Sequence, residues 1–270
     1  MAALLTLTVL SAMREPTQPS QWTEGHPISR EKAKRLVQGR LPSVYENIAL
    51  SCSAPLIWFR PTDNAPRILH NGTVTVVRTP KRLFGVTAAH VNDQYNEDLR
   101  NGGVTLQVKN EIIDGLRIID SSSKRDLATF ELDERLIQKL GLEPISLAWL
   151  PAGEGKGVLL AGYPANFRDH AEPKQIDWSP FFAIATARTV TSDQITILVP
   201  PDDGHVKNSL PLNCDLGGIS GGPIIGIFET KSYVAFHALS GVIYEQSNGW
   251  IGQRIVGVTA EAITDFGKIR

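Results

Sequence analysis

A cluster of glycines around one serine is the stretch of this sequence best suited to chemistry. In Cys214–Pro223 four glycines surround Ser220, and an apolar run over residues 224–228 follows directly. Such a density of glycine between apolar segments indicates special backbone angles or the close approach of two backbones. With Gly218 two positions before Ser220, the N–H groups of both can converge beside the hydroxyl, as in an oxyanion hole. The stretch therefore predicts a nucleophilic serine, and the alternative is a glycine-rich turn that leads into a buried strand.

Residues 218–222 also fit the G-x-S-x-G elbow of α/β-hydrolases. That fold places its acid and its histidine after the serine. Downstream of Ser220 the only histidine is His237 and the only aspartate is Asp265. Glu229 precedes His237, but the serine, glutamate and histidine would then share one short stretch of chain. The residue order and the absence of βαβ patterns therefore argue against the elbow.

A nucleophilic serine needs a base within hydrogen-bonding reach, and His90 is the best-placed histidine upstream of Ser220. It ends the segment 84–90, in which Ala88 and Ala89 allow the backbone to pack closely behind an imidazole. Alone, His90 fits equally well as an ordinary histidine at the end of a strand.

An acid is needed to orient the imidazole, and Asp126 is the candidate. It stands at the head of the alternating segment 126–132, where its carboxylate can point inward. Asp120 and Asp114 are alternatives, but no equally regular alternation follows them. The order His90, Asp126, Ser220 runs across two β-rich stretches, which predicts a site in the cleft between them.

The elements that must position these residues are predicted to be strands. Segments rich in β-branched and aromatic residues alternate with Gly, Pro, Asn and Asp about every dozen residues, which favours an all-β barrel or sandwich. A short helical spacing occurs at Asp133–Leu140 and is closed by Gly141. We predict an N-terminal extension over residues 1–54, partly helical from Ser29 to Gly39, a first β unit over 55–143, and a second over 144–270 with a short C-terminal helix after Thr259.

Composition narrows the class of protein. The apolar content of 42% and charged content of 20% are ordinary for a globular chain, and 27 basic against 28 acidic residues give no field that favours nucleic acid. The apolar segment 2–12 is too short to span a bilayer. Two cysteines and no metal-ligand spacing predict no cofactor and favour a cytoplasmic location, with export left open.

Three motifs together resemble the chymotrypsin/trypsin-like serine peptidase family. They are Thr87–His90, Asp126–Ala128 and Gly218–Pro223, and residues 160–164 also resemble a strand end of the stand-alone bacterial members with few disulfides. The resemblance covers about residues 55–262. It implies two six-stranded antiparallel β-barrels with the active site in the cleft between them.

The resemblance also implies roles for individual residues. Ser220 attacks the scissile carbonyl, His90 transfers the proton, Asp126 orients His90, and the N–H groups of Gly218 and Ser220 hold the oxyanion. The implied function is that of a serine endopeptidase acting on a polypeptide. A catalytically silent binding module and a serine esterase on the same scaffold are the alternatives, and the oligomeric state is left open.

Substrate-binding positions follow from the same resemblance. Cys214 corresponds to the floor of the pocket for the side chain before the scissile bond, with Asp215 beside it, although Asp215 also fits a surface turn. The substrate backbone is expected to pair with a strand made of Ser240, Gly241, Val242, Ile243 and Tyr244.

One departure from the family pattern concerns activation. Animal members usually carry Asp before the nucleophile, where it pairs with a new N-terminus after cleavage, and here Ile219 occupies that position. We therefore expect activity without removal of the N-terminal extension.

Overall fold

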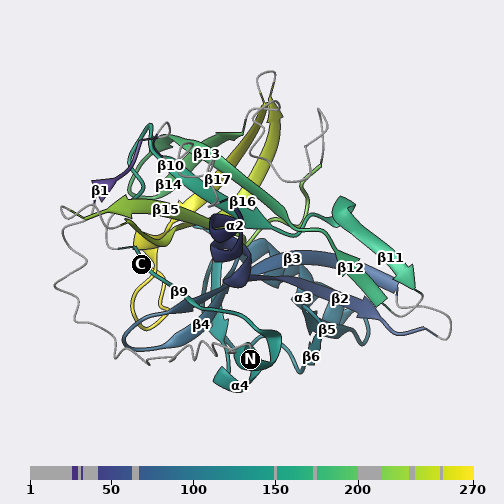
Figure 1. The fold of residues 1–270 in the computed structure, drawn as a ribbon. Coiled ribbons are helices and arrows are strands. Elements are labelled where there is room, and N and C mark those ends of the chain that lie inside the picture. Colours follow the sequence, from purple (N-terminus) through teal and green to yellow (C-terminus); the bar gives the residue numbers. More distant parts are fainter. Residues whose placement is uncertain are drawn as a thin grey trace, which may run out of the picture.

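The computed structural model describes residues 26–29, 32, 42–62, 67–148, 151–172, 175–199, 215–230, 235–249 and 252–270. Strands make up most of these residues (Figure 1). The apolar segment 2–12, most of the helix predicted over residues 29–39, and Cys214 lie outside them. No helix in the described ranges is long and apolar enough to span a membrane.

The first unit is an open antiparallel sheet with one added parallel strand. Its strand order is β6-β5-β2-β3-β4-β8-β7, and β9 pairs in parallel with β3. The strands are β2 (Ser53–Arg60), β3 (Arg67–Arg78), β4 (Leu83–Thr87), β5 (Thr105–Val108), β6 (Glu111–Ile113), β7 (Ile118–Ser122), β8 (Leu127–Glu131) and β9 (Ile145–Ser146).

The closed first barrel that the sequence predicted is therefore not present. The end strands β6 and β7 have only three and five residues, and the described residues show no backbone pairing between them. Residues 114–117 join the two strands, with Gly115 at φ 138°.

The second unit is a closed antiparallel barrel of six strands, as predicted. Its order is β15-β10-β13-β14-β17-β16, and pairing of β15 with β16 closes it. The strands are β10 (Gly157–Gly162), β13 (Phe181–Val190), β14 (Gln194–Val199), β15 (Pro223–Glu229), β16 (Ala235–Gly249) and β17 (Gly252–Thr259). A separate hairpin, β11 (Arg168–Glu172) and β12 (Gln175–Trp178), follows the 3₁₀ turn η2 (Ala165–Phe167). The predicted C-terminal helix is a single 3₁₀ turn, η3 (Ala260–Ala262).

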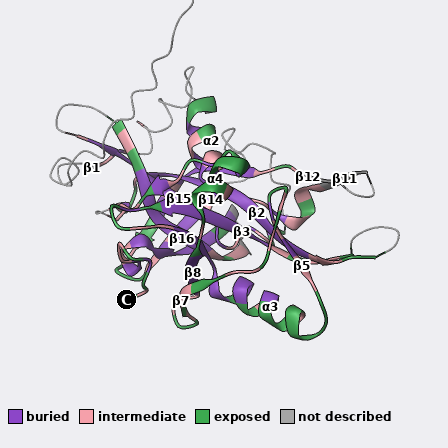
Figure 2. Ribbon diagram, turned by 90° about the horizontal axis from the view of Figure 1, so that it is seen from below, coloured by how far each residue is buried: buried purple, intermediate pink, exposed green. Residues whose placement is uncertain are grey.

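Apolar residues on the strands hold the two units together. One continuous core contains Val77 and Phe84 of the first sheet together with Leu159 and Ile225 of the barrel. Figure 2 shows the buried residues concentrated along the strands of both units. Because both sheets contribute to the same core, their facing edges are fixed relative to each other.

Within the described residues the helices α2, α3 and α4 pack on these sheets. The helix α2 (Pro42–Ser51) packs against β2, β10 and β13, over the junction of the two units (Figure 1). The helix α4 (Glu134–Leu140) confirms the short helix predicted there, with Asp133 accepting a hydrogen bond from the Arg135 N–H and Gly141 in the left-handed region at φ 63°.

The helix α3 (Ala89–Arg100) was not predicted, and it corrects the placement of His90. His90 lies in the first turn of this helix and not at the end of a strand. Val91 and Tyr95 are buried on the inner face of α3, while most of its other side chains are polar. Two apolar residues four positions apart are enough to fix the helix on the sheet but give a weak sequence signal.

Part of the N-terminal segment joins the second unit. The strand β1 (His26–Pro27) pairs with the end of β15, and Ile28 is buried. Lys32 lies 2.5 Å from the carboxylate of Glu229, which is itself buried. These residues add a strand to the outer edge of the barrel sheet.

Cys52 provides a test of the packing at the junction of the units. Its thiol is buried, donates to the Ala49 carbonyl at 3.4 Å, and is a free cysteine. Burial raises the pKa of the thiol to about 12, above that of an unfolded cysteine.

We predict that Cys52 resists alkylation by iodoacetamide at pH 8.5 in the native protein and reacts once the protein is unfolded. Its contribution to stability is present below the unfolded pKa and is lost as the pH rises toward the folded pKa of about 12. Peptide mapping by mass spectrometry after timed alkylation measures this. Rapid modification of Cys52 without unfolding would contradict the described packing.

Candidate active site

His90 and Asp126 meet where the neighbouring strands β4 and β8 end and begin. Asp126 Oδ2 lies 2.7 Å from His90 Nδ1, and Oδ1 accepts a hydrogen bond of 2.8 Å from the His90 backbone N–H. An ionised carboxylate only accepts hydrogen bonds, so the proton of a neutral imidazole is on Nδ1 and the lone pair is on Nε2. The pair is therefore arranged for His90 Nε2 to accept a proton.

Local backbone structure sets this contact. Asp126 immediately precedes β8 and adopts φ 48°, a left-handed conformation that is uncommon outside Gly, Asn and Asp. Its carboxylate accepts an otherwise unpaired N–H in the first turn of α3, which is also a favourable position for negative charge. Ala88 caps α3 without a side-chain hydrogen bond, so Asp126 performs that task from a distant part of the chain.

The loop around Ser220 holds two peptide groups in defined orientations. The carbonyl of Gly217 accepts a 2.7 Å hydrogen bond from the Ala165 N–H, and the carbonyl of Ile219 accepts one of 2.8 Å from the Gly222 N–H. In a trans peptide the next N–H points the opposite way. The N–H groups of Gly218 and Ser220 therefore point away from these bonds, and neither has an acceptor in the described part of the chain.

Polar side chains of β3 donate hydrogen bonds to this loop across the junction of the two units. Thr73 donates from Oγ1 to the Gly218 carbonyl at 2.9 Å, and its N–H donates to the Ser220 carbonyl at 2.8 Å. Thr75 Oγ1 donates to the Gly221 carbonyl at 2.8 Å. We call Asn71, Thr73 and Thr75 the β3 clamp. These three residues could not be predicted, because threonine and asparagine in a strand give no sequence signal for such a distant partner.

Tyr163 belongs to the same hydrogen-bond network. Its N–H donates to Thr73 Oγ1 at 3.1 Å, and its carbonyl accepts from the amide of Asn71 at 2.9 Å. Its hydroxyl donates to the Ser53 carbonyl at 3.2 Å, and burial raises the pKa of the phenol to about 12. Tyr163 therefore remains a neutral donor at physiological pH.

Close approach explains the glycines on either side of Ser220. A Cβ on Gly221 would lie 1.9 Å from the Thr73 carbonyl oxygen, and Gly221 adopts φ 93°. Gly218 adopts φ 102°, and its Cβ would lie 2.2 Å from the Asn71 amide nitrogen. The glycine cluster is thus required by the contact between this loop and β3.

The Ser220 loop lies near the first turn of α3, and no hydrogen bond joins Ser220 to His90 or Asp126 in the described part of the chain. Gly72 is between the two parts of the site, because its Cβ position is 2.6 Å from a Val91 methyl group and 3.4 Å from the Ser220 carbonyl. The Ser220 hydroxyl donates to the Tyr244 carbonyl at 3.4 Å. A hydrogen bond to His90 therefore requires the Ser220 side chain to turn, and catalytic hydrogen bonds of free enzymes are often incomplete in this way.

The strand predicted to pair with substrate lies inside the barrel sheet, with a neighbouring strand on each side. Gly241 and Val242 pair with β15 on one side and β17 on the other, and Ile243 exchanges hydrogen bonds with Gly221 and Gly222. Ser240 is buried at a bulge in the pairing of β16 with β15. The backbones of Gly241, Val242 and Ile243 are therefore paired within the barrel. The substrate-pairing role of Ser240, Gly241, Val242 and Ile243 remains a prediction.

The pairing of β16 with its neighbouring strands changes near Tyr244. The pairing with β15 ends at Val242, and a register shift against β17 follows between Ile243 and Glu245. The Tyr244 hydroxyl accepts a 2.8 Å hydrogen bond from Gln194. Burial first, and then the nearby carboxylates of Glu245 and Asp126, raise the pKa of the Tyr244 phenol.

The pocket-floor residues are only partly described. Cys214 lies outside the described residues. Asp215 is exposed, and its carboxylate accepts a 2.8 Å hydrogen bond from the Gly217 N–H. This bond closes a short turn in which the side chain folds back onto its own loop, as in the surface-turn alternative. The described side chains include no group of three His, Cys, Asp or Glu that could hold a metal ion.

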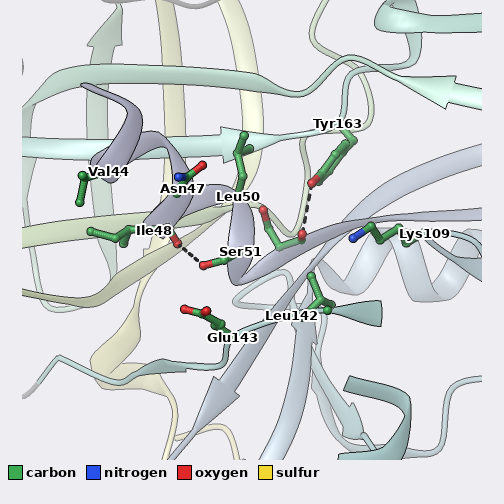
Figure 3. A pocket seen from close by; sticks show the side chains of 11 residues that line it. Val44, Asn47, Ile48, Leu50, Ser51, Lys109, Leu142, Glu143 and Tyr163 are labelled. Carbon is green, nitrogen blue, oxygen red and sulfur yellow. Dashed lines mark hydrogen bonds between the residues drawn. The ribbon is translucent and has the colours of Figure 1, made fainter. Parts of the chain in front are cut away.

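A separate pocket of about 560 Å³ lies under α2 (Figure 3). It contains none of His90, Asp126 and Ser220. The residues lining it come from α2, from the first unit and from the end of β10: Val44, Asn47, Ile48, Leu50, Ser51, Ser53, Lys109, Gly141, Leu142, Glu143 and Tyr163. Tyr163 connects the two regions, because its phenol points into this pocket and its backbone bonds to the β3 clamp.

Comparisons with known proteins give similarity of structure only. No protein-family model and no curated protein matches the chain. The serine protease domain of the Sesbania mosaic virus polyprotein is similar at 15% identity and a TM-score of 0.40, over 76% of this chain and 86% of that chain. A structure from work on coupled folding and binding of the Sesbania mosaic virus VPg protein is similar at 16% identity and a TM-score of 0.42, over 77% and 92%. At these scores the similarity assigns no role to any residue.

Replacing Thr73 tests the β3 clamp. Thr73→Val keeps the side-chain shape but leaves the Gly218 carbonyl without its donor and the Tyr163 N–H without its acceptor. We expect the free energy of unfolding to fall by about 1–3 kcal/mol, measured by urea denaturation. Thr105→Val on β5 is the control, because no hydrogen bond of its side chain is present in the described structure. Equal losses for the two variants would contradict the clamp.

Proposed function

We propose that this protein is a serine endopeptidase that hydrolyses peptide bonds through an acyl-enzyme intermediate. The observation that carries the proposal is the double hydrogen bond of Asp126 to His90. Gly72 separates the helix that carries His90 from the Ser220 loop, whose Gly218 and Ser220 N–H groups have no acceptor among the described residues. The order of the three residues in the sequence and the protease-like fold are consistent with it.

In the proposed reaction Ser220 Oγ attacks the scissile carbonyl. His90 Nε2 accepts the hydroxyl proton and then passes it to the leaving amine, while Asp126 keeps the proton on Nδ1 and stabilises the imidazolium. The N–H groups of Gly218 and Ser220 bind the oxyanion of the tetrahedral intermediate. Water then attacks the acyl-enzyme by the same route and releases the second product.

We further propose that the acyl part of the substrate pairs with β16 from Tyr244 to Gln246. This shifts the predicted pairing strand by a few residues, to the part of β16 beyond its last pair with β15. The Tyr244 carbonyl, which now accepts from Ser220, would be released when the hydroxyl turns to His90. The two-unit division at residues 55–143 and 144–270, and the resemblance to stand-alone bacterial members, remain predictions.

Activity without N-terminal cleavage is also part of the proposal. Ile219 is buried and packs in the barrel core with Leu216 and Ile224, where a charged residue would need a partner. The Gly218 N–H is already oriented by the bond between Ala165 and Gly217. The oxyanion hole therefore needs no new N-terminus to form.

One observation favours a second candidate, a catalytically silent module that binds peptides on the same fold. The Ser220 hydroxyl is directed at the Tyr244 carbonyl and not at His90. If that rotamer is permanent, the serine is not activated.

A fluorophosphonate probe separates the two candidates and tests the proposed function. We expect the full-length protein to be labelled on Ser220 and the label to be lost in Ser220→Ala, since only an activated serine reacts readily. Ser146→Ala, an exposed serine away from the loop, is the control and should keep the label. Absence of labelling in folded wild-type protein would favour the silent module, and labelling only after N-terminal cleavage would contradict the proposed independence from activation. Comparing peptide with ester substrates then separates a peptidase from an esterase.

A further inference from the structure

Arg168, at the base of the β11–β12 hairpin, has no carboxylate partner among the side chains that the structure describes. Arg168 donates from Nε to the Ala165 carbonyl at 2.9 Å, and its guanidinium carbon lies 5.8 Å from the centre of the Trp178 ring. No other contact of this side chain exists among the described residues. Other arginines pair with carboxylates, for example Arg78 with Glu134 and Arg82 with Glu131.

Trp178 adds a second unpaired donor. Its indole N–H is buried and has no hydrogen-bond acceptor within the described structure. The ring packs edge-on against Tyr163, with 6.4 Å between ring centres. The Arg168 side chain is half-buried, and this burial lowers its pKa. Arg168 and Trp178 together offer one positive charge and only hydrogen-bond donors, so they are suited to bind an anion.

The turn η2, which leads into the hairpin, bonds to the loop that carries Ser220. The Ala165 N–H holds the Gly217 carbonyl, and the Asn166 amide donates to the Asp215 carbonyl at 3.2 Å. Figure 1 shows the hairpin extending from the barrel near the ends of β2 and β3. Arg168 is therefore close to the proposed oxyanion hole, on the side of Tyr163.

The strands on either side of the Ser220 loop indicate where the acyl part and the leaving part of a substrate would lie. Residues 221 and 222 bond to Ile243 on one side, and the Cβ position of Gly222 is 2.2 Å from the Ala161 carbonyl on the other. The acyl part of the substrate is proposed to lie along Tyr244, next to Ile243. The leaving group must then depart on the opposite side, past Tyr163 and the base of the hairpin.

We propose that Arg168 determines specificity by binding a carboxylate in the leaving-group part of the substrate, with Trp178 as the residue that positions its guanidinium. This inference rests on the proposed peptidase function and adds a substrate class to it. The carboxylate is either an acidic side chain or the C-terminal carboxylate of a short peptide, and both offer two oxygens to the guanidinium fork.

The test uses quenched fluorescent peptides with one fixed acyl part and three leaving parts. One leaving part has Asp or Glu side chains and an amidated C-terminus, one is the same with Asn or Gln, and one is neutral with a free C-terminal carboxylate. We expect wild-type kcat/KM to be about ten- to a hundredfold higher for at least one carboxylate peptide than for the neutral amide. Which peptide is preferred identifies the source of the carboxylate.

Variants at position 168 then assign the preference to this side chain. Arg168→Met keeps the stem over Trp178 and removes the charge, and we expect the ratio of carboxylate to neutral peptide to fall to about one. Arg168→Lys should keep an intermediate ratio, because it retains charge without the fork. Arg188→Met, an exposed arginine on β13 that loses the same charge, should keep the wild-type ratio. Thermal unfolding of each variant reports whether it folds.

The outcomes separate this inference from the function on which it rests. Cleavage of all three peptides with equal kcat/KM by the wild type, or an unchanged ratio in folded Arg168→Met, overturns the role of Arg168 and leaves the peptidase in place. Absence of both peptide cleavage and fluorophosphonate labelling overturns the two proposals together.

Discussion

Hydrogen bonds from the β3 clamp to the carbonyls of the Ser220 loop are the interaction on which the candidate site depends. Thr73 and Thr75 satisfy the carbonyls of Gly218, Ser220 and Gly221, which face the buried junction of the two units and would otherwise lack donors. The same bonds fix the loop against β3, next to the start of α3. A strand of one unit thereby sets the backbone of the predicted nucleophile in the other.

The remaining features of the site follow from this contact. Glycine is needed at Gly221 because the Thr73 carbonyl lies where a Cβ would be, and this explains why small residues cluster around the serine. The Ala165 N–H bonds to the Gly217 carbonyl and thereby orients the Gly218 N–H, while the Gly222 N–H bonds to the Ile219 carbonyl and orients the Ser220 N–H. With Ile219 packed in the barrel core, the loop is stabilised by apolar burial where a zymogen-type peptidase uses an ion pair.

Much of this could be predicted from the sequence, and the exceptions have physical reasons. Alternating apolar residues indicated the strands, and Asp133 with Gly141 marked both ends of α4. The helix α3 was not predicted because only its inner face is apolar. The first sheet was expected to close, but closure depends on whether its two short end strands, β6 and β7, meet. The register shift of β16 between Ile243 and Glu245 was not predictable, because it depends on the pairing with β17. The β3 clamp was not predictable, because each of its bonds joins residues far apart in the chain.

A structure of the protein bound to a peptide boronic acid tests the central claim most directly. We expect a bond from boron to Ser220 Oγ and one boronate oxygen within about 2.7–3.1 Å of the N–H nitrogens of both Gly218 and Ser220. We also expect Ser220 Oγ to leave the Tyr244 carbonyl and to lie within reach of His90 Nε2. A boronate bound elsewhere, or bound to Ser220 with its oxygen away from both N–H groups, would contradict the account.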